Sequence, residues 1–398
     1  MPSDRRLLWV ISYHHACNDG TLMALIALLP ILARPDEMNL SYYEVGVLGL
    51  GLVVTVVVQY GVGRVADRVF SKYLLEIGSV LMGLSFALLL LVNDFTGLFS
   101  VVILMRLGAA FYHPIGTSWI TRKFTGPHLE TALGIQSGVG NFGVIIAMAS
   151  SGFLGEITWK APCVLWAAMN LVAVVLGLLI VEESSAPKIS PTVSRRSSRV
   201  TMRKMLLFTP AIVTGGALYQ ITSYFGPLNL THLSGPMAWE AGSADLIFAI
   251  WIGVGTITSY YFGAISARFG KFRLLAAGYI ASTISVSVLL FASQWWLIAP
   301  VLIFYGAFLF VTYPALFSFV TDSTVEEERG TAFGILFGFQ LGGGALAVYL
   351  CGTIADALSD ARYVFVVAAV LSGISLLSLF SWRRPGPSRG ATLPGGPA

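Results

Sequence analysis

The 398-residue sequence has little charge: Asp, Glu, Lys and Arg make up 11% of it, against roughly 25% in soluble domains. This scarcity excludes a soluble enzyme, a disordered chain and a nucleic-acid-binding protein with a broad basic face. The alternating polar pattern of a membrane-spanning β-barrel is also lacking. The three cysteines, Cys17, Cys163 and Cys351, are too few and too scattered for a disulfide framework or a zinc site. No P-loop is present, so the sequence does not support ATP-driven transport.

Long apolar runs dominate instead: 56% of the residues are hydrophobic and the mean hydropathy is +0.78. A helix needs about 20 apolar residues to cross ~30 Å of hydrocarbon. On this measure we predict an all-α membrane protein with twelve transmembrane helices. They cover residues 7–33, 43–63, 73–93, 98–120, 131–153, 161–181, 206–228, 245–265, 272–293, 296–319, 331–353 and 362–382. The first run lacks a small-residue cleavage site, so we expect it to stay as the first span.

The basic residues favour one side of the predicted spans. With a cytoplasmic N-terminus, twenty Lys and Arg residues fall on the cytoplasmic side, while Arg34, Lys160 and Arg362 fall outside and Arg106 lies within a span. The positive-inside rule therefore predicts a multi-pass protein of the cell membrane with both termini in the cytoplasm. We interpret the net charge of +4 as a topology signal, and we expect no nucleic-acid partner.

A polar segment divides the predicted spans into two groups of six. Residues 183–205, rich in Ser, Pro and basic residues, are predicted to be a cytoplasmic linker between an N-terminal bundle (1–182) and a C-terminal bundle (206–384). Residues 385–398 are predicted to be a disordered cytoplasmic tail.

The two halves repeat each other at a shift of 200 residues, which aligns Pro114 with Pro314 and Gly63 with Gly263. Such a repeat predicts two pseudo-symmetric six-helix bundles around a midplane site, an arrangement that supports alternating access. The loop after the second span recurs in both halves, and we predict that it acts as a conformational latch. The predicted latch residues are Gly63, Asp67, Arg68, Lys72, Gly263 and Arg268.

This loop, G-R-V-A-D-R-V-F-S-K at 63–72, resembles the G-x-x-x-D-R-x-G-R-K signature of the major facilitator superfamily. Three further motifs, H-x-x-N-D at 15–19, F-Y-H-P at 111–114 and G-N-F-G at 140–143, resemble the fosmidomycin-resistance type of drug exporter within that superfamily. The resemblance implies the major facilitator fold and efflux of a drug or metabolite, with the proton gradient as the energy source and no bound cofactor.

Four polar residues cluster on the first predicted helix: His14, His15, Asn18 and Asp19. Asp19 lies about 18 Å along the helix from Leu7, near the bilayer centre. A carboxylate there costs about 2.5–3.5 kcal/mol unless it is paired or protonated. We predict a protonation site formed by Asp19 with His14, His15 and, from the fourth span, His113. The alternative is an interhelical hydrogen-bond cluster that only locks packing.

Arg106 is the one basic residue predicted inside a span. Because a guanidinium stays charged, it needs a carboxylate, carbonyl groups or an anionic substrate. Both substrate binding and a fixed pair with Asp19 remain open. Neutral polar residues complete the predicted substrate site: Asn18, Gln136, Asn141, Tyr219, Tyr224, Tyr313 and Gln340. Glu76 is assigned to the cytoplasmic ion-pair belt instead.

We therefore predict a secondary transporter, not an enzyme, that exports a small anionic or polar compound in exchange for protons. Its expected partners are the small-molecule substrate and the lipid bilayer, and we expect a monomer. Uptake of a small carboxylate or chelate is the alternative. Transition-metal transport is a further one, because imidazole and carboxylate groups suit such ions. However, His14 and His15 point about 100° apart on a helix, so no metal site is assigned.

Overall fold

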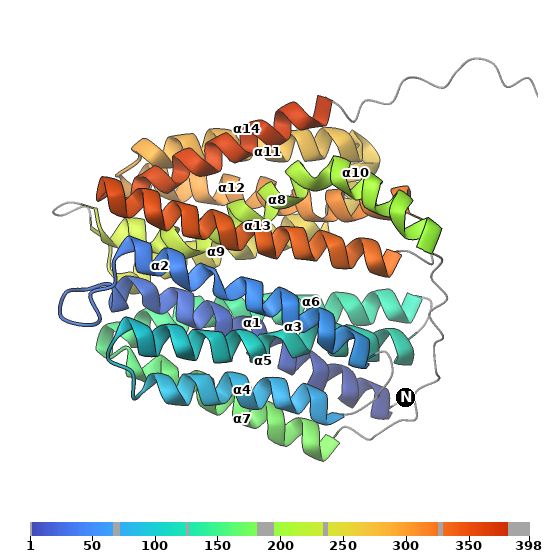
Figure 1. Cartoon of the computed structure of the whole chain (residues 1–398), viewed down its shortest axis with the longest axis horizontal. Helices are drawn as coiled ribbons and strands as arrows, with labels where there is room; N and C mark the ends of the chain where they lie inside the picture. Colours follow the sequence, from blue (N-terminus) through green and yellow to red (C-terminus); the bar gives the residue numbers. More distant parts are fainter. Residues whose placement is uncertain are drawn as a thin grey trace, which may run out of the picture.

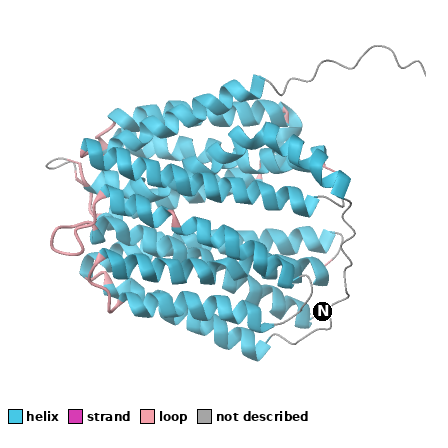
Figure 2. Cartoon of the chain, in the orientation of Figure 1, coloured by secondary structure: helices cyan, strands magenta, loops and turns pink. Residues whose placement is uncertain are grey.

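The computed structural model describes residues 2–66, 72–124, 127–180, 195–233, 238–324 and 329–380. Within these ranges it consists of helices joined by short turns, without strands (Figure 2). The helices form two stacked groups, with α1–α7 below and α8–α14 above in Figure 1. The first group comprises α1 (Pro2–Leu32), α2 (Tyr42–Gly49), α3 (Gly51–Ala66), α4 (Lys72–Leu89), α5 (Phe95–Lys123), α6 (Pro127–Ile157) and α7 (Lys160–Ile180). The second comprises α8 (Arg195–Thr231), α9 (Ala241–Tyr260), α10 (Phe262–Phe269), α11 (Lys271–Phe291), α12 (Trp295–Ser323), α13 (Arg329–Leu358), the short 3₁₀ helix η3 (Ala361–Tyr363) and α14 (Val364–Phe380).

Each predicted span corresponds to helix, which confirms the all-α class. Two spans are divided in the structure, and they occupy equivalent places in the halves: 43–63 falls on α2 and α3, and 245–265 falls on α9 and α10. The repeat is also visible in the helix bounds, since α12 begins and ends 200 residues after α5. The two halves are therefore built on one plan.

Ten helices in the described part of the chain are long and apolar enough to cross a membrane, so this is a multi-pass membrane protein. The apolar stretch of α4, Tyr73–Leu89, is shorter than the others. The helix α8 does not reach the same hydropathy. Residues 221–230 of α8 are all buried inside the protein, where polar side chains meet other helices rather than lipid.

The linker boundary differs from the prediction. The helix α8 begins at Arg195, so residues 195–205, predicted as linker, are the basic first turns of that helix. Helix-forming Arg, Met and Lys residues in this stretch account for the extension. Residues 181–194 and 381–398, with the rest of the predicted linker and the tail, lie outside the described residues.

The two halves meet at one end of the molecule, which we call the loop end because the α1–α2 and α8–α9 connections lie there. Two glycine pairs bring the backbones together. A Cβ on Gly46 of α2 would lie 2.9 Å from the Cα of Gly352 on α13, and one on Gly152 of α6 would lie 2.9 Å from the Cα of Gly242 on α9. Only glycine allows helices to approach this closely.

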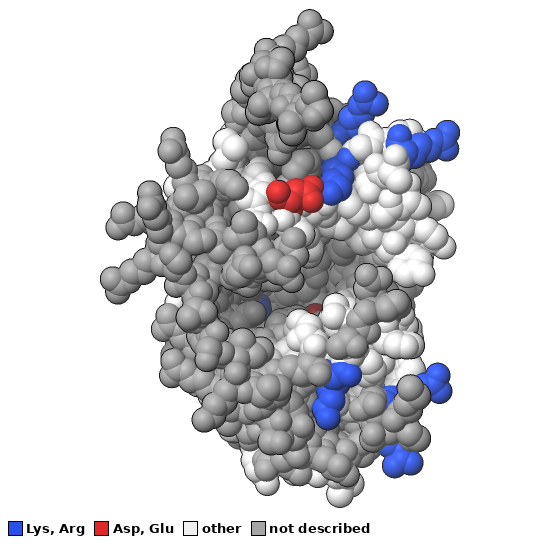
Figure 3. Space-filling model, turned by 90° about the vertical axis from the view of Figure 1, so that its right-hand side faces the viewer, with Lys and Arg blue, Asp and Glu red and all other residues white. Residues whose placement is uncertain are grey.

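The opposite end is open, and we call it the linker end because α7 ends and α8 begins there. Gly134 and Gly138 of α6 and Gly334 of α13 have no neighbouring atom within 4 Å of an added Cβ. A second hydrophobic cluster, separate from the main core, is built wholly from the N-terminal half and includes Leu8 and Trp119. The face seen in Figure 3 is hollowed between the halves, and a small acidic and a small basic surface are visible inside the hollow. The halves therefore enclose a cleft that is closed at the loop end.

Candidate functional site

The carboxylate of Asp19 lies at the centre of a polar cluster between the helices α1, α5 and α6. His15 Nε2 is 3.0 Å from Asp19 Oδ2, and His113 Nε2 is 3.3 Å from Asp19 Oδ1. Asn18 donates a hydrogen bond of 2.8 Å to the same Oδ1. The i,i+4 spacing on α1 aligns His15 with Asp19. Pro114 lies within α5 directly after His113. Of the four groups predicted to bind a proton, the structure brings three together.

The second ring nitrogen of His15 fixes how protons are held in this cluster. Its Nδ1 lies 2.9 Å from the main-chain oxygen of Gln136. A carbonyl oxygen only accepts, so Nδ1 carries a proton and donates it. At 3.0 Å, Nε2 and the Asp19 carboxylate then need one more proton between them, because two lone pairs would repel each other. The pair is either imidazolium with carboxylate or imidazole with carboxylic acid, and one proton moving about an ångström interconverts them.

Neighbouring groups hold the His15 ring in place. The ring stacks on Tyr112 with centroids 4.7 Å apart, and the amide of Gln136 donates a hydrogen bond of 2.8 Å to the Tyr112 hydroxyl. On the α6 side, a Cβ added to Gly140 would lie 2.4 Å from His15 Nδ1. The ring therefore has one available position, and glycine at position 140 is what leaves room for it.

The cluster is reached by solvent. The Asp19 side chain is 24% exposed and that of His113 is 43% exposed, although Asp19 lies on the central helix α1. His15 is 10% exposed. A group that exchanges protons with water must have such access, while a packing cluster needs none.

His14 faces the other way, as the helical angle between adjacent residues predicts. Its Nδ1 is 2.8 Å from the hydroxyl of Ser79, and its Nε2 is 3.7 Å from Glu76 Oε2, both on α4. Glu76 is buried against Gly177 of α7, and its assignment to the cytoplasmic ion-pair belt stays a prediction. The i,i+4 spacing of Lys72 and Glu76 suggested that surface pair. No local pattern in the sequence indicates that His14 contacts α4.

Arg106 is 3% exposed and lies between the halves. Its Nη2 donates a hydrogen bond of 2.7 Å to the hydroxyl of Tyr224, which is on α8 in the C-terminal half. Its Nε has no hydrogen-bond partner. No ion pair joins Arg106 to Asp19, although both are described, so the fixed pair considered from the sequence is absent in this state. Among the residues that the structure describes, no carboxylate pairs with this buried guanidinium.

The remaining predicted substrate residues line the same interface or lie behind it. Tyr219 of α8 stacks on Trp251 of α9 at 5.7 Å, and Tyr313 of α12 donates a hydrogen bond of 3.0 Å to the carbonyl of Gly215. Gln340 of α13 is buried and its amide nitrogen has no partner. Asn141 of α6 is half-buried. Tyr313 is thus engaged with the backbone, whereas the Gln340 amide is available.

The predicted latch lies at the linker end. Asp67 and Arg68 fall outside the described residues, as does the side chain of Lys72. Gly63 lies in the last turn of α3, where Pro114 Cβ would be 3.8 Å from an added Cβ, while no atom lies within 4 Å of one added to Gly263 of α10. Arg268 lies over the ring of Phe269 at 5.3 Å. The latch stays a prediction.

A metal ion is the other ligand that the cluster suits. Ligand atoms of His15, Asp19 and His113 all lie within 4.8 Å of one another. Two imidazoles and a carboxylate suit transition metals, and donation from His15 Nδ1 to a carbonyl is the usual second contact of a metal-bound histidine. No metal site is predicted from the sequence, because His14 is grouped there with these three residues.

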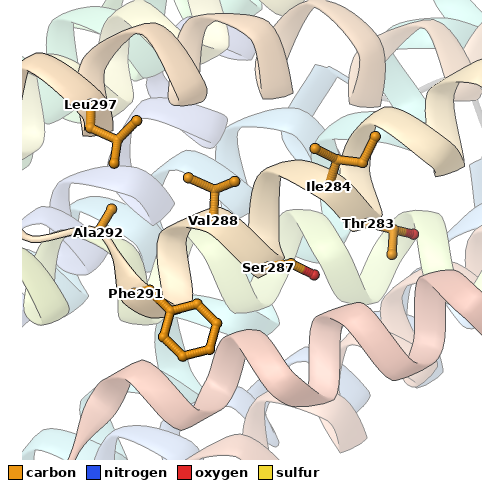
Figure 4. Close-up of a pocket in the computed structure, with 7 residues that line it drawn as sticks. All are labelled: Thr283, Ile284, Ser287, Val288, Phe291, Ala292 and Leu297. Carbon is orange, nitrogen blue, oxygen red and sulfur yellow. The ribbon is translucent and has the colours of Figure 1, made fainter.

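A separate groove of about 460 Å³ lies along α11 and the start of α12 (Figure 4). It is lined by Thr283, Ile284, Ser287, Val288, Phe291, Ala292 and Leu297. Ile284 and Phe291 are largely exposed on a membrane-spanning helix, so this groove faces lipid and takes no part in the candidate site.

Two repeated helical halves with a solvent-reached polar cluster and a buried arginine between them are the architecture of a membrane transporter. Residues 14–238 and 228–396 match the Major Facilitator Superfamily, and the chain belongs to this family. The fold and family expected from the sequence motifs are confirmed.

Related proteins include drug-resistance transporters. The chain is 26% identical over 365 residues to Multidrug resistance protein 1 of Bacillus subtilis (strain 168), covering 90% of this chain and 92% of the relative. It is 20% identical over 361 residues to the Quinolone resistance protein NorA of Staphylococcus aureus (strain COL), covering 88% and 90%. The predicted resemblance to drug exporters is thus confirmed.

Solved structures share the fold. The nucleoside transporter NupG superposes with a TM-score of 0.79 at 17% identity, covering 96% of this chain and 98% of that one. A bacterial homolog of the human lysosomal transporter Spinster, solved in an inward-facing, occupied conformation, has a TM-score of 0.81 at 14% identity and covers 96% and 97%. At these identities the likeness is one of architecture.

Proposed function

We propose that this chain exports a small anionic or polar compound across the cell membrane in exchange for protons, by alternating access. The observation that carries the proposal is the separation of two charges: Asp19 is bound by two histidines, while Arg106 is buried without a carboxylate. One group is suited to a proton and the other to an anion. The kinship with drug-resistance proteins favours export.

Proton binding takes place at Asp19 with His15 and His113. In the open cleft water reaches Asp19 and His113, so a proton can leave toward the linker end. His15 keeps its hydrogen bond to Gln136 and the proton that it shares with Asp19, so the exchanged proton is the one held between Asp19 and His113. This geometry lets the cluster change its charge by one without rearranging its backbone.

Arg106 provides the anion site. The unsatisfied Nε and the forked guanidinium suit a carboxylate or phosphonate group, which would accept two parallel hydrogen bonds. Tyr224 occupies the guanidinium in the present state. Because Tyr224 belongs to the other half, a substrate that displaces it also loosens the contact between the halves. Substrate binding thereby favours reopening at the loop end, which is the coupling that alternating access requires.

With both termini in the cytoplasm, the open linker end is the cytoplasmic side and this structure is inward-open. The latch residues at that end, Gly63, Asp67, Arg68, Lys72, Gly263 and Arg268, would then hold the cytoplasmic side closed in the opposite state. The protein works as a monomer in the bilayer and needs no bound cofactor, because the proton gradient supplies the energy.

The test is transport by purified protein in liposomes, in which inside-out molecules are selected by blocking an engineered cysteine from outside. A proton gradient directed out of the lumen should raise substrate flux into it about tenfold, and Asp19→Asn should remove this stimulation while leaving substrate binding measurable, because the amide cannot carry the exchanged proton. Ser287→Ala, in the lipid-facing groove of α11, is the control and should keep the stimulation.

Other outcomes decide between the alternatives. Unchanged proton-driven transport by the Asp19→Asn protein would exclude the mechanism. Accumulation in the direction of the proton gradient would establish uptake instead of export. Thermal stabilisation of the wild-type protein by Zn²⁺ or Ni²⁺, lost in His113→Ala together with transport of the metal, would establish metal transport.

A further inference from the structure

Another acidic residue lies within the membrane-spanning part of the protein, outside the site described above. Asp245 is on α9, about 6 Å along the helix from Ala241. It is 0% exposed, and neither of its carboxyl oxygens has a hydrogen-bond partner. Asp245 belongs to the C-terminal half, whereas the Asp19 cluster is formed by helices of the N-terminal half.

Asp245 lies where the halves touch at the loop end. A Cβ added to Gly152 of α6, in the other half, would lie 2.6 Å from Asp245 Oδ2. The two residues are therefore in van der Waals contact across the closed interface. Opening of the loop end must separate Gly152 from Asp245 and let water reach the carboxyl.

The groups around Asp245 do not compensate a negative charge. Glu156 of α6 occupies the N-terminus of α9, where its Oε1 accepts a hydrogen bond of 2.7 Å from the Ala241 amide. Arg34, the nearby cation, donates to both Glu156 oxygens at 2.7 Å. Glu156 thus pairs with the positive end of the α9 helix dipole and with Arg34, so neither is left to neutralise Asp245. Its carboxylate also adds a second negative charge nearby. The neighbouring helices α1, α8 and α12, where described, give Asp245 no hydrogen bond or ion pair.

An isolated carboxylate in such a place is strongly unfavourable, so the buried side chain holds a proton. We propose that Asp245 is a second proton-binding site, loaded while the loop end is closed and emptied to the outer solution when it opens. The proposal rests on the alternating access proposed above. This proton is not carried across the membrane, since it enters and leaves on the same side. It makes closure of the loop end depend on outer pH.

The sign of this dependence follows from linkage. In the open state the exposed carboxyl ionises at about pH 4, whereas the buried carboxyl of the closed state would ionise at a higher pH. Between these two pH values the closed state binds one proton more than the open state. In that range each unit of rising pH favours the open state by about tenfold. Acid outside holds the loop end closed, and alkali releases it.

The test measures the loop-end equilibrium directly, without substrate. Spin labels on Glu37→Cys and Gln294→Cys, exposed positions on loops of the two halves, report the opening as a distance by electron–electron resonance. The native cysteines are buried, which favours selective labelling. Asp19→Asn, His15→Gln and His113→Gln are included in the background so that the central cluster adds no pH dependence. Between pH 6 and 8 the open-to-closed ratio should rise up to about a hundredfold.

Asp245→Asn and Asp245→Ala should each reduce that change to less than about twofold, since neither side chain titrates. Glu156→Gln is the matched control and should keep the pH response, because Asp245 is untouched. A full pH response in both Asp245 variants would overturn the inference while leaving alternating access in place. Label distances that stay the same at every pH in every variant would overturn it together with alternating access.

Discussion

Replacing Arg106 with alanine is expected to weaken binding of the anionic substrate by a factor of about a hundred or more. Removing one partner of a buried, hydrogen-bonded charge pair costs about 2–5 kcal/mol. The substrate is first identified by thermal-shift screening of small carboxylates, phosphonates and anionic antibiotics against the wild-type protein. Binding to each variant is then measured by isothermal titration calorimetry in detergent.

Two further variants separate charge from packing. Arg106→Lys keeps the charge but not the fork, so binding should fall by less than in Arg106→Ala. Tyr224→Phe removes the hydrogen-bond partner that competes with the substrate for the guanidinium. Substrate affinity in Tyr224→Phe should therefore rise rather than fall. Undiminished binding to a well-folded Arg106→Ala protein would exclude Arg106 as the anion site.

Gly140→Ala is expected to lower proton-driven transport by about a hundredfold. The added methyl would lie 2.4 Å from His15 Nδ1. The ring cannot move aside cheaply, because Tyr112, the Gln136 carbonyl and Asp19 hold its remaining sides. Displacement of the ring by an ångström breaks the alignment that proton transfer needs, and such misplacements cost about 10²-fold. Flux in liposomes with an imposed pH gradient measures the effect.

Gly138→Ala is the matched control for this substitution. It is on the same helix half a turn away, and its added Cβ meets nothing within 4 Å. Both changes also have the same effect on helix propensity. Equal transport in the two variants would show that the position of the His15 ring does not matter for coupling.

The architecture was predictable because each span must satisfy its own backbone in lipid and must be apolar for about 20 residues. The division of two spans into shorter helices was harder to predict from the sequence. Gly49 and Gly51 flank the break at Leu50, but glycines are common in membrane spans and do not by themselves predict one. The break arises where α2 contacts α13 while α3 contacts α5. The start of α8 was missed because basic Ser-rich residues at 195–204 have the composition of a linker.

The candidate site was predictable along single helices and not between them. The i,i+4 spacing paired His15 with Asp19 correctly. Whether Arg106 would meet Asp19 or Tyr224 depends on how α5 faces α1 and α8, which no local pattern encodes. Asp245 was not predicted as a site residue for a related reason. It lies at the start of a predicted span, where a charged residue is expected at the membrane surface. Its burial comes from Gly152 in the other half.

The glycine pairs at the loop end bear on how easily this transporter can cycle. Gly46 with Gly352 and Gly152 with Gly242 join the halves backbone to backbone. Long side chains lose about 1.5–2 kcal/mol of rotamer freedom when they are fixed, whereas glycine has none to lose. Closing an interface between glycines therefore costs little side-chain entropy, and reopening it regains little. The two states can stay close in free energy, so that a single proton or substrate molecule is enough to tip the balance between them.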